Sequence, residues 1–136
     1  MSPLLFLLVA EGLSRSIKEA NRLGTFFGIQ LTQNLQISNL LFVDDILIFC
    51  SGSVRDFNTL DDILKIFSKS TGMNINFGKS SVTSFQLSRE EEQALLALFP
   101  FNLARLEEGL HYLGFFLKPN DYRKRDWVWL LEKLEK

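Results

Sequence analysis

The chain contains 136 residues, 46% of them hydrophobic and 23% charged, which predicts one globular domain with a substantial core and excludes a disordered protein. Its formal net charge of −1 argues against a protein that binds nucleic acid by itself, because such proteins usually carry a clear positive excess. Cys50 is the only cysteine, so the chain has no internal disulfide partner and no cysteine-based zinc site, and we expect an intracellular protein.

The amino-terminal segment is apolar from Leu4 to Ala10. It is too short to span a bilayer, no positive charge precedes it, and Glu11 follows without a convincing signal-peptide cleavage site. We therefore expect a buried helix and no membrane association. Ser2 suits the cap of such a helix, and Pro3 suits its first turn.

Two short extended pieces, residues 24–29 and 35–38, flank a loop and lead into the most apolar stretch of the chain, residues 40–50. The acids Asp44 and Asp45 interrupt that stretch in its middle, and each half is typical of a short strand. Because aspartate tolerates turn conformations better than its apolar neighbours, we expect a hairpin with its tight turn at these acids.

Such a hairpin would pair Val43 with Ile46 and Leu41 with Ile48. The two carboxylates would then lie close together at the tip of an apolar ribbon. Like charges at that distance disfavour joint ionisation unless a cation neutralises them, which favours a metal site. The alternative is a solvated turn, since the chain contains a second acidic doublet at residues 61–62 with no sign of chemistry around it.

Helices are expected on either side of an alternating segment. The first begins at the cap Ser53 and ends at Gly72, and a second begins at the Ser-x-x-Glu sequence from Ser88 and stops before Pro100. Between them, residues 73–80 alternate in the manner of a strand.

The last third of the chain predicts a strand and a helix. Residues 111–117 are typical of a strand interrupted by a glycine, and His111 is expected to be a surface residue because no second histidine or cysteine is near it. Residues 121–136 are expected to form a helix that gathers its apolar side chains on one face, which are Trp127, Leu130, Leu131 and Leu134.

Four short motifs, taken in chain order, resemble the reverse transcriptases of plant non-LTR retrotransposons of the long interspersed element type. Phe42-Val43-Asp44-Asp45 resembles the aromatic-x-Asp-Asp motif of the polymerase palm. Residues 2–6 resemble the end of the family segment Gln-Gly-Asp-Pro-Leu-Ser-Pro, and Asn76 and Lys79 fill the polar positions of Gly-x-x-Asn-x-x-Lys-Ser. Residues 112–114 resemble the Tyr-Leu-Gly element on which these polymerases rest the primer strand.

The resemblance implies an α+β fold, in which residues 1–119 form a partial palm with an antiparallel sheet and helices packed on one face. Residues 120–136 would begin a thumb helix. The parent enzyme would copy an RNA template by extending a DNA primer with deoxynucleotides. Such a function is compatible with a nuclear location.

The resemblance also implies roles for particular residues. Asp44 would be the direct ligand of two magnesium ions and Asp45 its close support. Lys79 would neutralise or protonate the departing pyrophosphate, and Phe42 would pack beside the primer end. The primer strand would contact Tyr112, Leu113 and Gly114.

Two family elements have no counterpart in the sequence, the Gln-Gly pair ahead of Ser2 and the strand that supplies the first metal-binding aspartate. We therefore expect a carboxy-terminal palm fragment without activity of its own. Two alternatives stay open. One is a non-catalytic nucleic-acid or protein binding module that retains the palm fold, and the other is an unrelated α+β domain with a structural Asp-Asp turn.

Overall fold

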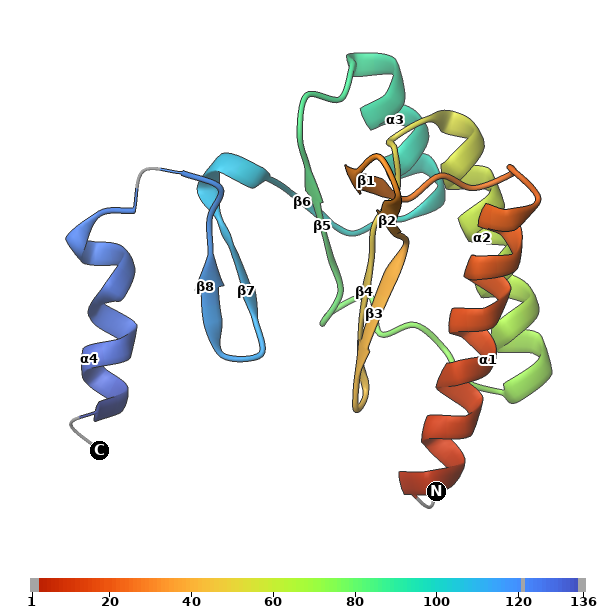
Figure 1. Ribbon diagram of the computed structural model, residues 1–136, viewed down its shortest axis with the longest axis horizontal. Coiled ribbons are helices and arrows are strands. Elements are labelled where there is room, and N and C mark those ends of the chain that lie inside the picture. Colours follow the sequence, from red (N-terminus) through yellow and green to blue (C-terminus); the bar gives the residue numbers. More distant parts are fainter. Residues whose placement is uncertain (1–2, 121, 135–136) are drawn as a thin grey trace.

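The computed structural model describes residues 3–120 and 122–134, and Figure 1 shows helices and strands distributed along the whole of that chain. The helices are α1 (Pro3–Arg22), α2 (Val54–Thr71), α3 (Arg89–Leu98) and α4 (Val128–Leu134), with short 3-10 helices η1 (Leu106–Glu108) and η2 (Lys124–Trp127). The strands are β1 (Ile29–Thr32), β2 (Leu35–Ile37), β3 (Asn39–Phe42), β4 (Asp45–Ile48), β5 (Ser81–Ser84), β6 (Asn102–Arg105), β7 (Leu110–Tyr112) and β8 (Phe115–Leu117). The α+β class expected from the sequence is confirmed.

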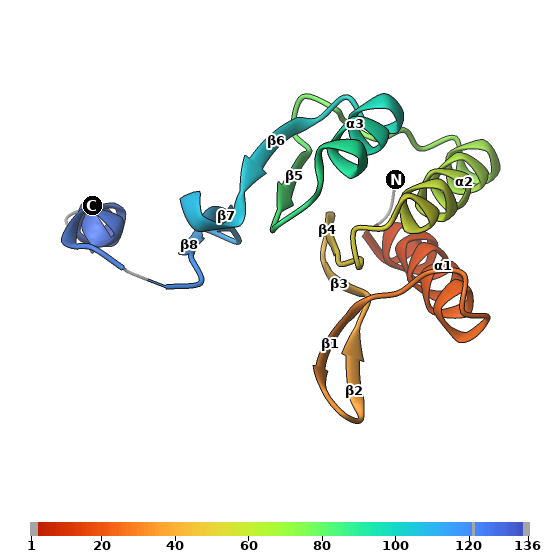
Figure 2. The same cartoon turned by 90° about the horizontal axis from the view of Figure 1, so that it is seen from above.

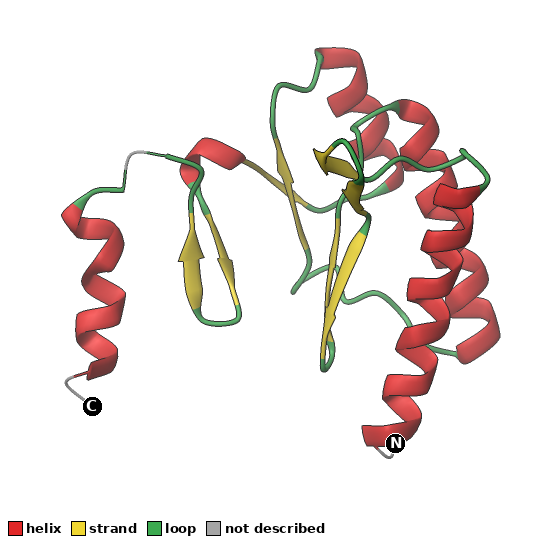
Figure 3. Cartoon of the chain, viewed as in Figure 1, coloured by secondary structure: helices red, strands yellow, loops and turns green. Residues whose placement is uncertain are grey.

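The strands of the described residues form separate two-stranded sheets (Figure 3). The pairs β1–β2, β3–β4 and β7–β8 are antiparallel hairpins, which confirms the antiparallel pairing expected from the sequence. The pair β5–β6 is parallel, because helix α3 carries the chain back to the starting end of β5 before β6 begins. The sheets do not join into one continuous sheet in this part of the chain.

The elements follow one another along the longest axis of the molecule. Helices α1 and α2 lie side by side at one end, and the β3–β4 hairpin lies next to α1 (Figures 1 and 2). The pair β5–β6 comes next, and the β7–β8 hairpin and α4 occupy the other end.

The core consists of two apolar clusters that share helix α2. In the first, Leu13 and Ile17 of α1 and the buried Phe26 pack against Ile46 and Ile48 of the hairpin. The second cluster joins the start of α2 to α3, and its buried members are Phe57, Leu95 and Phe99. Helix α2 is therefore the element that connects the acidic hairpin to the rest of the chain.

Helix α2 begins and ends where the sequence predicts. The Ser53 hydroxyl accepts a hydrogen bond from the Asp56 N–H at 3.1 Å, and Gly72 closes the helix with a left-handed φ of 72°. The Asp56 carboxylate does not complete a capping box. It is fully buried and accepts hydrogen bonds from Phe27 N–H at 3.1 Å and from both the N–H, at 3.0 Å, and the hydroxyl of Ser51.

Helix α3 carries the capping box expected at its start. Ser88 and Glu91 exchange hydrogen bonds between side chain and backbone in both directions, at 3.3 and 2.8 Å. The bond from the Ser88 N–H is the main reason that the pKa of the Glu91 carboxyl lies below its ordinary value. The helix ends at Leu98, before Pro100, as expected.

Helix α1 is buried only after its first two turns. Ala10, Leu13 and Ile17 are buried, whereas Leu4 and Leu8 are more than 70% exposed, so the expectation of a buried helix is wrong for the first two turns. The expected cap at Ser2 lies outside the described residues. No helix in the described part of the chain is both long and apolar enough to cross a bilayer.

Residues 73–80, expected as a strand, contain no strand and instead lead through a turn at 77–79 into β5. The backbone and side-chain oxygens of Asn76 both accept a hydrogen bond from the Lys79 N–H, at 3.0 and 3.2 Å. This local bonding gives the backbone an alternative to a strand ladder, which the alternation of apolar residues does not reveal.

The carboxy-terminal helix leaves most of its expected apolar face open to solvent, since Trp127, Leu131 and Leu134 are exposed and Leu130 is half-buried. Trp129, which lies outside that expected face, is half-buried, with its ring 5.9 Å from that of Phe115 in an edge-on arrangement. Asp121 and residues 135–136 of the expected helix lie outside the described residues.

We predict that Asp56→Asn lowers the free energy of unfolding by about 2–4 kcal/mol, because an amide replaces a buried carboxylate that accepts charge-assisted hydrogen bonds and its NH2 group would face the same donors. Urea unfolding followed by circular dichroism measures the change. Asp44→Asn is the matched control, since Asp44 is exposed, and it should change stability by no more than about 0.5 kcal/mol. Equal unfolding midpoints for the two variants would contradict the role given to Asp56.

Candidate active site

The acidic doublet lies at the tip of the β3–β4 hairpin. Phe42 pairs with Asp45 and Leu41 with Ile46, so the turn consists of Val43 and Asp44, and Asp45 is the first residue of β4. The hairpin is confirmed, but the expected pairings of Val43 with Ile46 and of Leu41 with Ile48 are wrong because the turn comes one residue earlier.

The turn places Val43 in a conformation that its side chain disfavours. Its φ of 53° lies in the left-handed region, which is unusual for a residue branched at Cβ and costs about 1–2 kcal/mol. Turn propensity alone would have placed an aspartate there. The tertiary contacts at the base of the hairpin therefore set the register and impose the strain on the tip.

The base of the hairpin is fastened to helix α1 by a polar contact. The Asn39 amide donates a hydrogen bond of 2.8 Å to the hydroxyl of Ser14, which is buried. Asn39 pairs with Ile48, and Ile48 packs on the first core cluster. The sequence analysis missed Ser14, although its position fits the same helical stripe as Leu13 and Ile17, which is a signal that could have found it.

The two faces of the hairpin have different surroundings. Ile46 and Ile48 pack against the core, whereas Phe42 and Asp45, which are cross-strand partners on the opposite face, are exposed. An aromatic side chain and a carboxylate therefore lie next to each other on the open face, with the Asp44 carboxylate in the adjoining turn.

Neither carboxylate of the doublet forms a hydrogen bond or an ion pair with another described residue, and both acids are exposed. The other doublet differs, because Asp61 pairs with Lys65 across one turn of α2. Asp44 and Asp45 thus offer oxygen atoms that no side chain of the described chain neutralises.

Lys79 and the acidic doublet lie on different segments of the chain. Lys79 lies in the turn at 77–79, and its side chain has no partner among the described residues. The segment that holds it overlaps the β3–β4 hairpin in Figure 1 but separates from it in Figure 2.

Tyr112, Leu113 and Gly114 form the tip of a second hairpin, so the expected single strand at 111–117 is wrong. Leu113 and Gly114 both have positive φ, 51° and 78°, which is the combination that tight hairpin turns require. The β5–β6 pair lies between this hairpin and β3–β4 in both views (Figures 1 and 2), so these three residues are not next to the acids.

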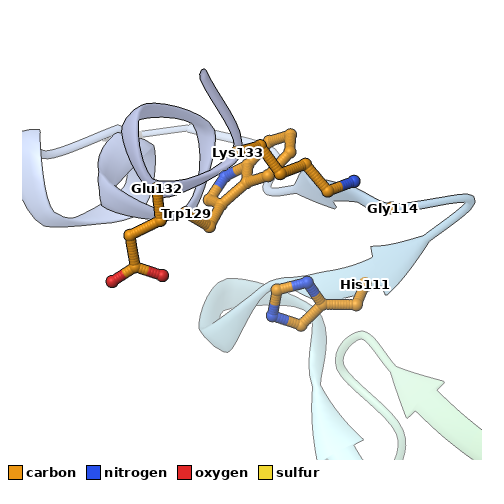
Figure 4. A pocket seen from close by; sticks show the side chains of 5 residues that line it. All are labelled: His111, Gly114, Trp129, Glu132 and Lys133. Carbon is orange, nitrogen blue, oxygen red and sulfur yellow. The ribbon is translucent and has the colours of Figure 1, made fainter. Parts of the chain in front are cut away.

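A shallow groove of about 300 Å³ separates the β7–β8 hairpin from α4 (Figure 4). The Lys133 amine lies 5.4 Å from the centre of the Trp129 ring and so close to Gly114 that a Cβ there would be 2.8 Å from it. His111 is exposed, as expected, and its ring lies 5.0 Å from that of Phe116.

Cys50 contributes no reactive group near the hairpin. Burial raises the pKa of its thiol above the ordinary value, and the nearby Asp56 carboxylate raises it further. The side chain therefore stays protonated at neutral pH and contacts both core clusters.

The comparison with known families decides the assignment. The family model described as reverse transcriptase (RNA-dependent DNA polymerase) matches residues 1–117, which reaches the end of β8. The chain belongs to the reverse transcriptase family. The family expected from the Phe-x-Asp-Asp motif is confirmed at this level, and membership implies binding of a nucleic-acid template in general.

The acidic hairpin of this reverse transcriptase offers the type of ligand that magnesium prefers, but too few ligands to complete its coordination. Carboxylate oxygens are the ligands that Mg²⁺ prefers, and Asp44 and Asp45 present them without competing partners. Mg²⁺ also requires near-octahedral geometry, and no group of three acidic, histidine or cysteine side chains that could hold a metal occurs within the described residues.

We predict that the 136-residue chain binds Mg²⁺ with a dissociation constant weaker than about 1 mM, because two neighbouring carboxylates cannot build an octahedral site alone. Isothermal titration calorimetry of the chain and of Asp44→Asn measures the affinity. Tight, stoichiometric binding that Asp44→Asn abolishes would show that the described residues already complete a site.

Proposed function

We propose that this chain serves RNA-directed DNA synthesis as part of the palm of a retrotransposon reverse transcriptase of the non-LTR type. The observation that carries the proposal is the acidic doublet at the tip of a core-anchored hairpin, within a chain whose first 117 residues match the family. The order of the four motifs along the sequence supports the retrotransposon origin.

In this proposal Asp44 is the direct metal ligand and Asp45 its support. When bound, Mg²⁺ would supply charge stabilisation at the primer 3′-hydroxyl and at the departing pyrophosphate. The hairpin contributes positioning, because its inner face is packed on the core and its base is bonded to α1.

The open face of the hairpin is suited to the primer end. Phe42 is 55% exposed and lies directly opposite Asp45, so its ring can pack against the last nucleotide while the acids lie beside the reacting group. Tyr112, Leu113 and Gly114 would contact the primer backbone further along, and their position at an exposed tip leaves room for it.

Lys79 is proposed to hold a proton that it can give to the departing pyrophosphate. Its amine has no partner among the described residues, which leaves it available for an anionic group. Because the segment that holds Lys79 is separate from the β3–β4 hairpin in Figure 2, this role requires that bound nucleic acid or nucleotide brings the two segments together.

The described residues do not complete the metal site, so we propose that a further carboxylate must come from outside them for activity. Without a carboxylate that binds both metal ions, the ions are not held in the correct positions. Most of the charge stabilisation in this reaction depends on these ions.

We predict that the chain alone gives no primer extension on an RNA template with Mg²⁺ and four deoxynucleotides. Extension should appear when a fingers-and-palm segment of a related reverse transcriptase, supplying the first aspartate, is added. It should then be lost in Asp44→Asn and retained in Asp62→Asn, an acid of the other doublet.

Binding of a labelled RNA–DNA hybrid, measured by fluorescence anisotropy in the same samples, distinguishes a part of a polymerase from a non-catalytic binding module. A non-catalytic binding module would bind the hybrid without ever extending the primer in the complemented mixture. Template-dependent extension by the chain alone, abolished by Asp44→Asn, would overturn the proposed need for a further carboxylate.

A further inference from the structure

The alternation of side chains along the acidic hairpin is compatible with two registers. In the observed register Leu41 pairs with Ile46, and residues 43–44 form the turn. If residues 44–45 formed the turn, Leu41 would pair with Ile48. Each partner would shift by two positions relative to the observed pairing, so every side chain would stay on the same face of the hairpin. The apolar pattern therefore does not choose between the observed and the shifted register.

The preferences of the turn residues favour the shifted register. The observed turn holds Val43 at a φ of 53°, which side chains branched at Cβ disfavour. The shifted turn would begin at Asp44, and aspartate tolerates this conformation better. Val43 would then lie in a strand, where branched side chains are common. A contact outside the turn must therefore stabilise the observed register.

Strand β4 is anchored beyond its end by contacts that involve no residue of β3. The Ser51 N–H lies 2.8 Å from the Phe27 carbonyl oxygen and 3.0 Å from the buried Asp56 carboxylate, which also accepts a bond from the Ser51 hydroxyl. A change of register would therefore move β3 and not β4, by about 7 Å toward the base of the hairpin. The connection between β2 and β3, which is Ser38 alone, would take up the released residues.

Asn39 is the residue of β3 that distinguishes the two registers. Its amide donates a hydrogen bond of 2.8 Å to the hydroxyl of Ser14, which is 2% exposed, and its side-chain oxygen accepts a bond of 3.2 Å from the Ser38 hydroxyl. In the shifted register Leu41 would take the place of Asn39 opposite Ile48. The buried Ser14 hydroxyl would then lose its donor, which is unfavourable.

We propose that Asn39 is a positioning residue for the acidic doublet, because its bond to Ser14 selects the observed register. In that register Asp44 lies in the turn, and Asp45 begins β4 opposite Phe42. In the shifted register both acids would lie in the turn, and Asp45 would no longer have an aromatic partner. The selection of the register does not depend on what the doublet binds, whereas its importance for catalysis rests on the function proposed above.

An exchange of two side chains tests this selection. Asn39→Leu combined with Leu41→Asn keeps the composition of β3 and moves the amide by two positions along the strand. In the shifted register the introduced amide would lie next to Ser14 and restore its hydrogen bond. The exchanged chain should therefore fold and adopt the shifted register.

Nuclear Overhauser contacts between Hα atoms report the register directly. In an antiparallel pair these atoms are close where the partners do not exchange hydrogen bonds, and such partners alternate with hydrogen-bonded ones. The first close pair after the turn is 41–46 in the observed register and 42–47 in the shifted one. The unmodified chain should show the 41–46 contact, and the exchanged chain should show the 42–47 contact in its place.

Removal of the bond gives a second measurement. In Asn39→Ala and in Ser14→Ala neither register has the bond, so the strain at Val43 should decide, and the 42–47 contact should replace the 41–46 contact. Adding Val43→Gly to Asn39→Ala should restore the 41–46 contact, because glycine adopts a positive φ without strain. Leu40→Ala, on the outer face of the same strand, is the matched control and should keep the observed register.

Retention of the 41–46 contact in the exchanged chain or in Asn39→Ala would overturn the proposal. Loss of both contacts in a chain whose other signals stay dispersed would overturn it as well, because the bond would then hold the hairpin together without selecting its register. In the complemented primer-extension reaction, a shifted register should reduce extension at least about tenfold, since it misplaces the acids. A shifted register with undiminished extension would support the selection by Asn39 and contradict the metal-binding role proposed for the doublet.

Discussion

The buried carboxylate of Asp56 is the constraint on which the rest of the structure depends. Asp56 lies in the first turn of α2. Its carboxylate accepts hydrogen bonds from Phe27, which precedes the first hairpin, and from Ser51, which follows the acidic hairpin. Burying a charge is unfavourable unless hydrogen bonds satisfy it, so these segments must come together around it. The acidic hairpin is thereby held against α1 and α2, and Ser14 of α1 accepts a hydrogen bond from Asn39 at its base.

This arrangement explains why a small chain can present two like charges on a strained turn. The inner face of the hairpin packs on the core through Ile46 and Ile48. The backbone strain of the hairpin is therefore located at its tip, where Val43 has a left-handed conformation. The acids have no structural partner within the described chain, which is expected of groups that act on something outside it. Asp61, in the other doublet, is by contrast bonded to Lys65 on the helix surface.

The helices and the acidic hairpin could be predicted because their signals are local. Caps at Ser53 and Ser88 and the acid break in an apolar run specify short stretches of backbone. The errors come from contacts between segments distant in the sequence. The bond from Asn39 to α1 fixes the base of a hairpin whose turn comes one residue earlier than expected, and Trp129, outside the expected apolar face, contacts Phe115 edge-on.

The candidate site was predictable in its residues but not in its geometry. The Phe-x-Asp-Asp motif identified Asp44 and Asp45, and its place among ordered motifs, not the doublet itself, pointed to the family that the comparison confirmed. No sequence signal showed that Lys79 lies in a turn and not in a strand, since that turn forms through hydrogen bonds to Asn76. The burial of Asp56 could not be predicted either, because burial of a carboxylate depends on donors from other segments.

We propose that the tip of the β3–β4 hairpin is the metal-binding element of this chain. The most direct test is a titration with paramagnetic Mn²⁺ followed by ¹H–¹⁵N NMR of the 136-residue chain. The account predicts that the amide signals of residues 43–45 broaden at the lowest Mn²⁺ concentration, before those of the doublet at 61–62, and that Asp44→Asn removes this preference. Equal broadening at both doublets, or earlier broadening at 61–62, would contradict it.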